Sequence, residues 1–163
     1  MWYNVTVKAR MFIDTSVIGG CYDEEFEVVS RLLMAEFNAA RAVAVVSSLT
    51  LEELELAPDR VRQVLDGIPD SALEFVHLDE DSAHLADEYV GDGIVGQGSL
   101  IDAQQVAIAT VSKVDVIVSW NFKHIVNLNR IRLFAATNLR HGLVTPEIRS
   151  PREVLTDYEE ESV

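Results

Sequence analysis

Three carboxylates and one amide follow predicted strands or lie on predicted helices. They are Asp14, Glu53, Asp102 and Asn121. Carboxylates that converge from separate elements repel one another, and Mg²⁺ or Mn²⁺ relieves that repulsion because both cations take oxygen ligands. A cation held in this way activates water and neutralises the charge that develops on a phosphodiester during hydrolysis. The four positions therefore predict metal-assisted cleavage of a phosphodiester.

The elements that must position these side chains alternate between strands and helices. The predicted strands are 5–13, 42–46, 74–78 and 114–119, with 131–135 as a further candidate. The predicted helices are 24–41, 49–57, 58–66, 79–90 and 100–112, and the glycine-rich stretch 91–98 is predicted to be a loop. This alternation is typical of a parallel sheet covered on both faces. Ligands of such sheets bind beyond the carboxyl ends of the strands, where Asp14 and Asn121 are expected to lie.

The other two acids are placed on helices. On a helical wheel Glu53 falls close to Leu49 and Leu56, on an apolar side of its helix. An acid near a buried stripe is costly unless it is paired or binds a metal. Asp102 lies at the head of the helix predicted at 100–112, with Gln105 on the same face.

Each of these residues also has an ordinary structural interpretation. Asp14 begins Asp-Thr-Ser, which favours turns and helix caps, and Asp102 is a candidate N-cap after Gly98-Ser99. Glu53 can be a surface acid, Asn121 a turn residue and His124 a packing or capping residue. Taken together the metal-binding interpretation gains weight, because independent accidents would not all fall at one edge of the sheet.

Length and composition predict one soluble domain. The chain has 163 residues with 48% hydrophobic content, and no apolar run approaches the roughly 20 residues that span a bilayer. We expect an N-terminal extension at 1–10, a single domain at 11–156 and an acidic tail at 157–163. A single cysteine, Cys21, excludes an internal disulfide and indicates a reducing cytoplasm.

The net charge of −14 argues against general affinity for nucleic acids. The charge is uneven along the chain, however. Fourteen acids and two arginines fall in 50–102, whereas 121–156 contains six basic residues and two acids. A polyanion can therefore still meet a locally basic surface.

Four segments together resemble the PIN domain, and more narrowly the VapC-like toxins of type II toxin–antitoxin systems. They are FIDTSVIGG, SSLTLEELE, LIDAQQVAIAT and VDVIVSWNFKHI, and the resemblance extends from Met11 to about Leu155. It implies a three-layer α/β/α sandwich with a central, mainly parallel sheet. It also implies a ribonuclease, a hydrolase that requires magnesium or manganese and cuts RNA at phosphodiester bonds.

The resemblance assigns roles to individual residues. The three acids of the family map onto Asp14, Glu53 and Asp102 as metal ligands, and the fourth acid, where the family has one, falls at Asn121. Groups that orient these ligands map onto Thr15, Ser16 and Ser119, and expected RNA contacts are Lys123, His124 and Arg130. Asn121 contributes oxygen but no charge, so we expect one well-held metal and a weaker second one.

The family also implies partners. A small antitoxin protein is expected to block the acidic cleft with a basic side chain such as Arg, and the chain is expected to form a homodimer without membrane attachment. One alternative remains open, and two others are disfavoured by the sequence. The open alternative is a PIN-like module that binds RNA or protein without cleaving. A phosphotransfer enzyme with Asp14 as nucleophile lacks the Asp-x-Asp pattern, and the glycines of 91–96 are wrongly spaced for a dinucleotide site.

Overall fold

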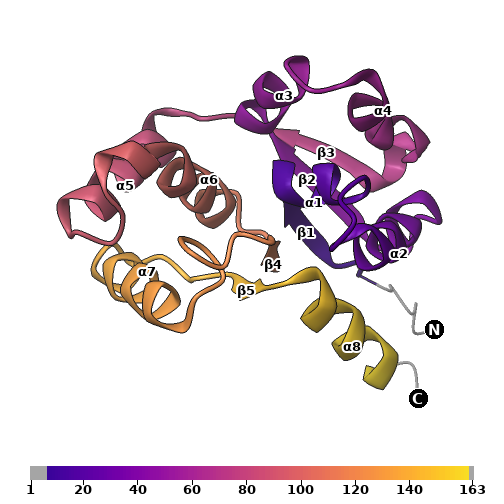
Figure 1. The fold of residues 1–163 in the computed structure, drawn as a ribbon. Coiled ribbons are helices and arrows are strands. Elements are labelled where there is room, and N and C mark those ends of the chain that lie inside the picture. Colours follow the sequence, from indigo (N-terminus) through magenta and orange to yellow (C-terminus); the bar gives the residue numbers. More distant parts are fainter. Residues whose placement is uncertain (1–6, 162–163) are drawn as a thin grey trace.

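The computed structural model describes residues 7–161, with side chains placed through residue 156. Five parallel strands form one sheet in the order β3-β2-β1-β4-β5. The strands are β1 (Arg10–Ile13), β2 (Val43–Ser47), β3 (Leu73–Val76), β4 (Val116–Val118) and β5 (Glu147–Arg149). β1 lies in the middle, so the residue that follows it stands at the centre of the sheet edge (Figure 1).

Helices cover both faces of this sheet. They are α1 (Thr15–Gly20), α2 (Glu27–Asn38), α3 (Ser48–Glu55), α4 (Asp59–Arg62), α5 (Glu80–Gly91), α6 (Leu100–Val111), α7 (Leu128–Arg140) and α8 (Pro151–Glu161). Short 3₁₀ turns occur at η1 (Gln63–Gly67), η2 (Asp70–Ala72) and η3 (Gln97–Ser99). Figure 1 shows α2 and α8 on one side and α5, α6 and α7 on the other.

The alternating direction of the side chains along β1 explains why a hydrophobic core lies on each face of the sheet. Met11 and Ile13 are buried in a core that includes Leu33 of α2, while Phe12 points to the other face and packs in a core with Tyr89 of α5. Successive side chains of a strand point to opposite faces, so one short apolar strand supplies both cores. The predicted α/β/α sandwich with a parallel sheet is confirmed.

The C-terminal third differs from the sequence prediction. The candidate strand 131–135 is wrong, because these residues lie inside α7. Asn127 caps that helix by accepting hydrogen bonds from the backbone N–H groups of Asn129 and Arg130, and Phe134 is one of its buried residues. Such a cap stabilises a helix start by about 1 kcal/mol.

Two elements near the C-terminus were not predicted. β5 has three residues, and α8 begins at Pro151, where proline suits the first helical position. The backbone of α8 continues to Glu161, so the acidic tail expected from residue 157 begins within a helix. At the other end, β1 begins at Arg10, and residues 1–6 of the expected extension lie outside the described residues.

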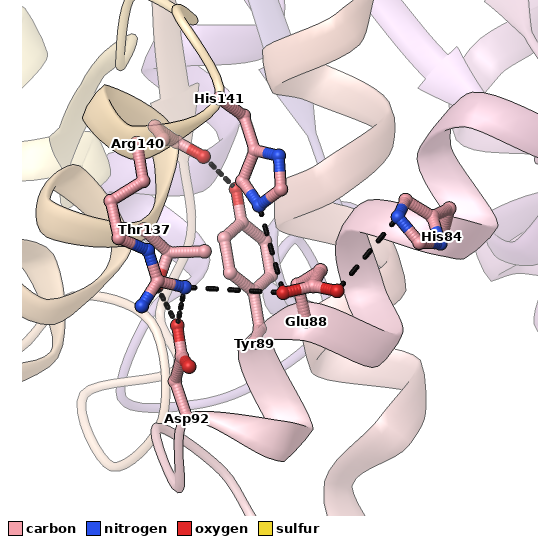
Figure 2. Close-up of polar contacts among 8 residues, drawn as sticks. His84, Glu88, Tyr89, Asp92, Thr137, Arg140 and His141 are labelled. Carbon is pink, nitrogen blue, oxygen red and sulfur yellow. Dashed lines mark hydrogen bonds and ion pairs between the residues drawn. The ribbon is translucent and has the colours of Figure 1, made fainter.

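Polar contacts join α5 to α7 on the face away from α2 and α8, and Figure 2 shows this α5–α7 cluster. Asp92 accepts hydrogen bonds from the Thr137 hydroxyl and the Arg140 guanidinium, both at 2.6 Å. The Tyr89 hydroxyl donates to Asn138 Oδ1 at 2.5 Å, and both residues are fully buried.

Glu88 completes the cluster, since its carboxylate lies 3.6 Å from His141 Nε2 and 3.8 Å from His84 Nε2. Every carboxylate of the α5–α7 cluster therefore has a cationic or potentially cationic partner.

In the part of the chain that the structure describes, no helix is both long and apolar enough to cross a membrane.

Candidate active site

Asp14 is fixed at the central edge of the sheet by the residues around it. It follows β1 directly and caps α1, and its Oδ1 accepts hydrogen bonds from the backbone N–H groups of Ser16 at 3.1 Å and Val17 at 3.4 Å. The Ser16 hydroxyl donates to Oδ1 and the Ser119 hydroxyl to Oδ2, both at 2.5 Å. Ser119 reaches Asp14 because β1 and β4 are paired in parallel, with Ile13 opposite Val118.

Burial dominates the electrostatics of Asp14. The side chain is buried, and this burial raises the pKa of the carboxyl above its usual value, although the bonds from Ser119 and Ser16 partly counteract the effect. All of its hydrogen-bond donors are neutral. An ionised Asp14 is thus a buried charge for which the described residues provide no cationic partner.

Asp102 lies in the first turn of α6, two residues inside the helix start, and is not the N-cap; Ser99 holds that position. Burial raises the pKa of Asp102, and the charge of His124 and a hydrogen bond with the Asn121 side chain act in the opposite direction. Asn121 Oδ1 accepts the backbone N–H of His124 at 3.0 Å. The amide nitrogen of Asn121 is therefore the group left to donate to Asp102.

Ser119 and Asn121 connect the surroundings of the two acids. Ser119 Oγ donates to Asp14 and also accepts the backbone N–H of Asn121 at 3.0 Å, and the Asn121 side chain lowers the pKa of Asp102. His124 Nε2 lies 3.3 Å from Ser99 Oγ. Asn121 was expected to offer oxygen to a metal or its water. Its side-chain oxygen accepts one bond within the protein and keeps a second lone pair, so the expected contact with a metal or its water stays a prediction.

Glu53 lies on α3 and is exposed, so the expectation that it stands on an apolar, buried side is wrong. The reason is the placement of α3, whose Leu54 is buried while Leu56 is 92% exposed. A residue that the sequence did not single out as functional holds α3 in place. The buried Gln105 of α6 accepts a hydrogen bond from Ser47 at 2.6 Å and donates to Thr50 at 2.9 Å.

The three acids nevertheless share one pocket, which we call the acidic pocket. Its volume is about 190 Å³ and its lining consists of Asp14, Thr15, Ser16, Glu53, Ile101, Asp102, Gln105 and Asn121. No lysine or arginine of the described chain contributes to that lining. Of the expected RNA contacts, Lys123 is exposed, His124 is half-buried and Arg130 donates to the backbone carbonyl of Ile94.

The acidic pocket suits a cation that keeps some of its water ligands better than one whose ligands all come from protein side chains. In the described part of the chain, no three acidic, histidine or cysteine side chains stand close enough to hold a metal ion directly. The donors are nevertheless oxygens, and Mg²⁺ commonly keeps several waters while binding one or two carboxylates. Thr15 is one of the residues that line the same pocket, and its Oγ1 is buried and has no hydrogen-bond partner among the described residues. These groups fit a partly hydrated cation.

The fold is found in known toxin structures. VapC20 of Mycobacterium tuberculosis, a toxin that cleaves the sarcin-ricin loop, is 16% identical with a TM-score of 0.53, covering 70% of this chain and 92% of its own. A toxin–antitoxin complex from Klebsiella pneumoniae is 15% identical with a TM-score of 0.51, over 70% of this chain and 88% of its own.

VapBC2 of Rickettsia felis, bound to a DNA fragment of its promoter, is 14% identical with a TM-score of 0.51, over 86% of this chain and 98% of its own. No family model and no curated protein matches the sequence. At these identities the likeness establishes the fold. This chain therefore shares the fold of these toxin structures, which is the fold that the resemblance seen in the sequence implied.

Proposed function

We propose that this protein is a metal-dependent endoribonuclease. The observation that carries the proposal is the acidic pocket, where Asp14, Glu53 and Asp102 arrive from three separate elements at one edge of a parallel sheet. Burial raises the pKa of both Asp14 and Asp102, and the pocket offers them no cationic lining. Such an arrangement is expected where a bound cation completes the charge balance.

The residues have distinct tasks in this proposal. Asp14, Glu53 and Asp102 would hold Mg²⁺ or Mn²⁺, which supplies an activated water and stabilises the charge on the phosphodiester. Ser16 and Ser119 fix both oxygens of Asp14, so the carboxylate meets its ligand without reorganising. Asn121 orients Asp102 through its amide, while Gln105 positions α3 and with it Glu53.

Cleavage of labelled RNAs tests the proposal. Wild-type protein is incubated with a mixed RNA panel in Mg²⁺, in Mn²⁺ and in EDTA, beside the variants Asp14→Asn and Asp102→Asn. We expect cleavage only with metal, and a loss of at least about 100-fold in each variant, because ligand carboxylates are removed. Asp92→Asn, an equivalent change in the α5–α7 cluster, is the control and should retain full activity. Cleavage that survives EDTA or Asp14→Asn would overturn the proposal.

We further propose that the protein acts as a toxin restrained by a small antitoxin. Support comes from the fold, since the Klebsiella pneumoniae and Rickettsia felis structures contain toxin–antitoxin pairs. The acidic pocket would attract a basic antitoxin side chain such as Arg. Expression of the chain alone should slow growth, whereas Asp14→Asn should not, and co-expression of the adjacently encoded protein should restore growth. Equal growth of both strains contradicts the toxin role.

A non-catalytic PIN-like module is the second candidate. Two observations favour it: Asn121 contributes no charge where the family has an acid, and Glu53 is exposed rather than held against the other acids. Thermal unfolding with and without Mn²⁺ separates the two candidates. A catalytic site should show both a metal-dependent rise in melting temperature and RNA cleavage, whereas a binding module would bind RNA without cutting it. The predicted homodimer can be checked on the same samples by sedimentation.

A further inference from the structure

A second cavity adjoins the acidic pocket and shares Ser16 and Asn121 with it. The remaining lining residues are Gly19, Gly20, Asp23, Phe26 and Trp120, and the cavity measures about 530 Å³. We call it the Gly19 cavity. Its volume falls within the range of about 300–1,000 Å³ that is typical of small-molecule sites. Anything bound there would lie next to the group held by the three acids.

One wall of the Gly19 cavity is a rigid aromatic pair. Phe26 stacks on Trp120 with ring centroids 4.3 Å apart and an interplanar angle of 21°. The indole Nε1–H of Trp120 donates to the Ser30 hydroxyl at 2.9 Å, and its backbone N–H donates to Ser16 Oγ at 2.9 Å. The wall is therefore fixed before any ligand arrives.

The two glycines have different roles. A Cβ on Gly20 would lie 2.5 Å from Ser30 Oγ and 3.1 Å from Trp120 Nε1, so Gly20 is required for the packing of the aromatic wall. A Cβ on Gly19 would meet nothing within 4 Å. Gly19 therefore leaves open space that the packing of the protein does not need.

The negative charge of the Gly19 cavity favours the base of a nucleotide over its phosphate. Asp23 is the one charged residue among its described lining groups, and its Oδ1 accepts the backbone N–H of Glu25 at 2.9 Å. A carboxylate without a neighbouring cation repels phosphate. It does accept hydrogen bonds from the N–H groups of bases, as acidic side chains do with the amino group of cytosine. Guanine offers two adjacent N–H donors on one edge, which match the two oxygens of a carboxylate.

We infer that the Gly19 cavity binds the base of a nucleotide adjacent to the cleaved phosphodiester, with a preference for guanine. This inference rests on the proposed ribonuclease function, because the shared residues Ser16 and Asn121 place the cavity next to the acidic pocket. Recognition of single-stranded RNA commonly combines aromatic contacts with hydrogen bonds to base edges, and the cavity offers both. The acidic pocket would then carry out the cleavage of the RNA. The Gly19 cavity would determine which base lies next to the cleaved phosphodiester.

Nucleoside binding without metal tests the inference separately from cleavage. The chain has two tryptophans, Trp2 and Trp120, so a Trp2→Phe background isolates the emission of Trp120. Guanosine, adenosine, cytidine and uridine are titrated in EDTA while this emission is followed. We expect quenching by guanosine that saturates in the millimolar range, with at least threefold weaker binding of the other three nucleosides.

Two variants and one matched control sharpen the result. Gly19→Leu fills the cavity and should weaken guanosine binding at least tenfold without lowering the melting temperature. Asp23→Asn should abolish the preference for guanosine. Gly91→Leu is the control, because Gly91 also has open space around it and ends α5, far along the chain from the cavity. It should bind guanosine like the parent protein.

Three outcomes would overturn the inference: no quenching by guanosine, equal quenching by all four nucleosides, or unchanged binding in Gly19→Leu. If no nucleoside binds while a protein partner loses affinity for Gly19→Leu, the cavity is a protein-docking pocket and the inference is wrong. Because no metal is present, a positive result would stand even if RNA cleavage fails. Conversely, cleavage with no nucleoside binding would leave the nuclease proposal intact.

Discussion

The acidic pocket and the α5–α7 cluster treat carboxylates in opposite ways. In the acidic pocket, burial raises the pKa of Asp14, and its donors are two hydroxyls and two backbone N–H groups. In the α5–α7 cluster, the hydrogen bond from Thr137 and the charge of Arg140 lower the pKa of Asp92 (Figure 2). The fold thus supplies a cation to Asp92 in the α5–α7 cluster, whereas the donors to Asp14 are all neutral.

The difference separates a structural from a functional use of charge. The α5–α7 cluster is electrically complete as it stands, and its contacts join two helices. The acidic pocket is incomplete, because ionised Asp14 and Asp102 gain full compensation only from a ligand. Natural proteins commonly give up stability at their active sites in this manner. The comparison therefore predicts which substitutions should weaken the fold and which should strengthen it.

The largest effect on stability is expected in the α5–α7 cluster. Tyr89→Phe removes the hydroxyl that donates to Asn138 Oδ1 and leaves that buried oxygen without this donor. An unsatisfied buried polar group costs about 1–3 kcal/mol, so chemical denaturation should show a loss of this size. RNA cleavage should not change, because the cluster lies outside the acidic pocket.

Tyr22→Phe provides the control for this loss. Tyr22 is 41% exposed, and its ring lies beneath the guanidinium groups of Arg31 and Arg60. Removal of its hydroxyl should leave the free energy of unfolding nearly unchanged. Equal stability of Tyr89→Phe and Tyr22→Phe would contradict the view that the cluster is a structural device.

Asp14→Asn should act in the opposite direction. The new amide oxygen can still accept the N–H groups of Ser16 and Val17, and the Ser119 hydroxyl can turn to accept from the amide nitrogen. The buried charge is removed, so we expect a gain of about 0.5–2 kcal/mol in the free energy of unfolding without metal. This gain should accompany the loss of cleavage. A melting temperature below that of the wild type would show that Asp14 is structural.

Much of this site follows from the sequence, for identifiable reasons. Asp14 and Asn121 could be placed because parallel strands bring their carboxyl ends to one edge, and the apolar runs before them are unambiguous. Asp102 could be placed because 100–112 is rich in residues that favour helices and begins directly after Gly98-Ser99. The two-layer core was also predictable, since it depends on the period of side chains along β1.

Other features depend on contacts that a sequence pattern does not contain. The exposure of Glu53 depends on how α3 packs, and the direction of the Asn121 amide depends on the backbone N–H of His124. The run at 131–135 was misread because its apolar residues suit a strand and the Asn127 cap was overlooked. β5, with three residues, is too short to give a periodic signal.

A third substitution, Asn121→Asp, places another acid beside Asp102. Asn121→Asp keeps an oxygen for the His124 N–H but replaces the amide that bonds to Asp102 with a like charge. We expect a loss of about 1 kcal/mol in EDTA. We also expect a larger rise in melting temperature with Mn²⁺ than the wild type shows, because metal binding stabilises the folded state. Asn129→Asp on the exposed start of α7 is the control, and a Mn²⁺ shift equal to that of the wild type would contradict the proposed role of Asn121.

The pH dependence of stability is expected to show the smallest effect, but it compares the acidic pocket with the α5–α7 cluster most directly. Asp14 has a raised folded pKa, so the folded state retains a proton that the unfolded chain has lost, and its stabilising effect disappears as pH rises through the folded pKa. Asp92 has a lowered folded pKa, so its stabilising effect is present above the usual value of 3.8 and disappears as pH falls through the folded pKa.

Melting curves in EDTA from acid to neutral pH should therefore separate the two variants. At neutral pH, Asp14→Asn should melt above the wild type and Asp92→Asn below it, and both differences should shrink toward zero as the solution is acidified. Asp102→Asn should follow Asp14→Asn with a smaller separation, because His124 and Asn121 already offset part of the burial at Asp102. If Asp14→Asn and Asp92→Asn shift the melting temperature in the same direction at neutral pH, the two regions do not differ in the way that their contacts imply.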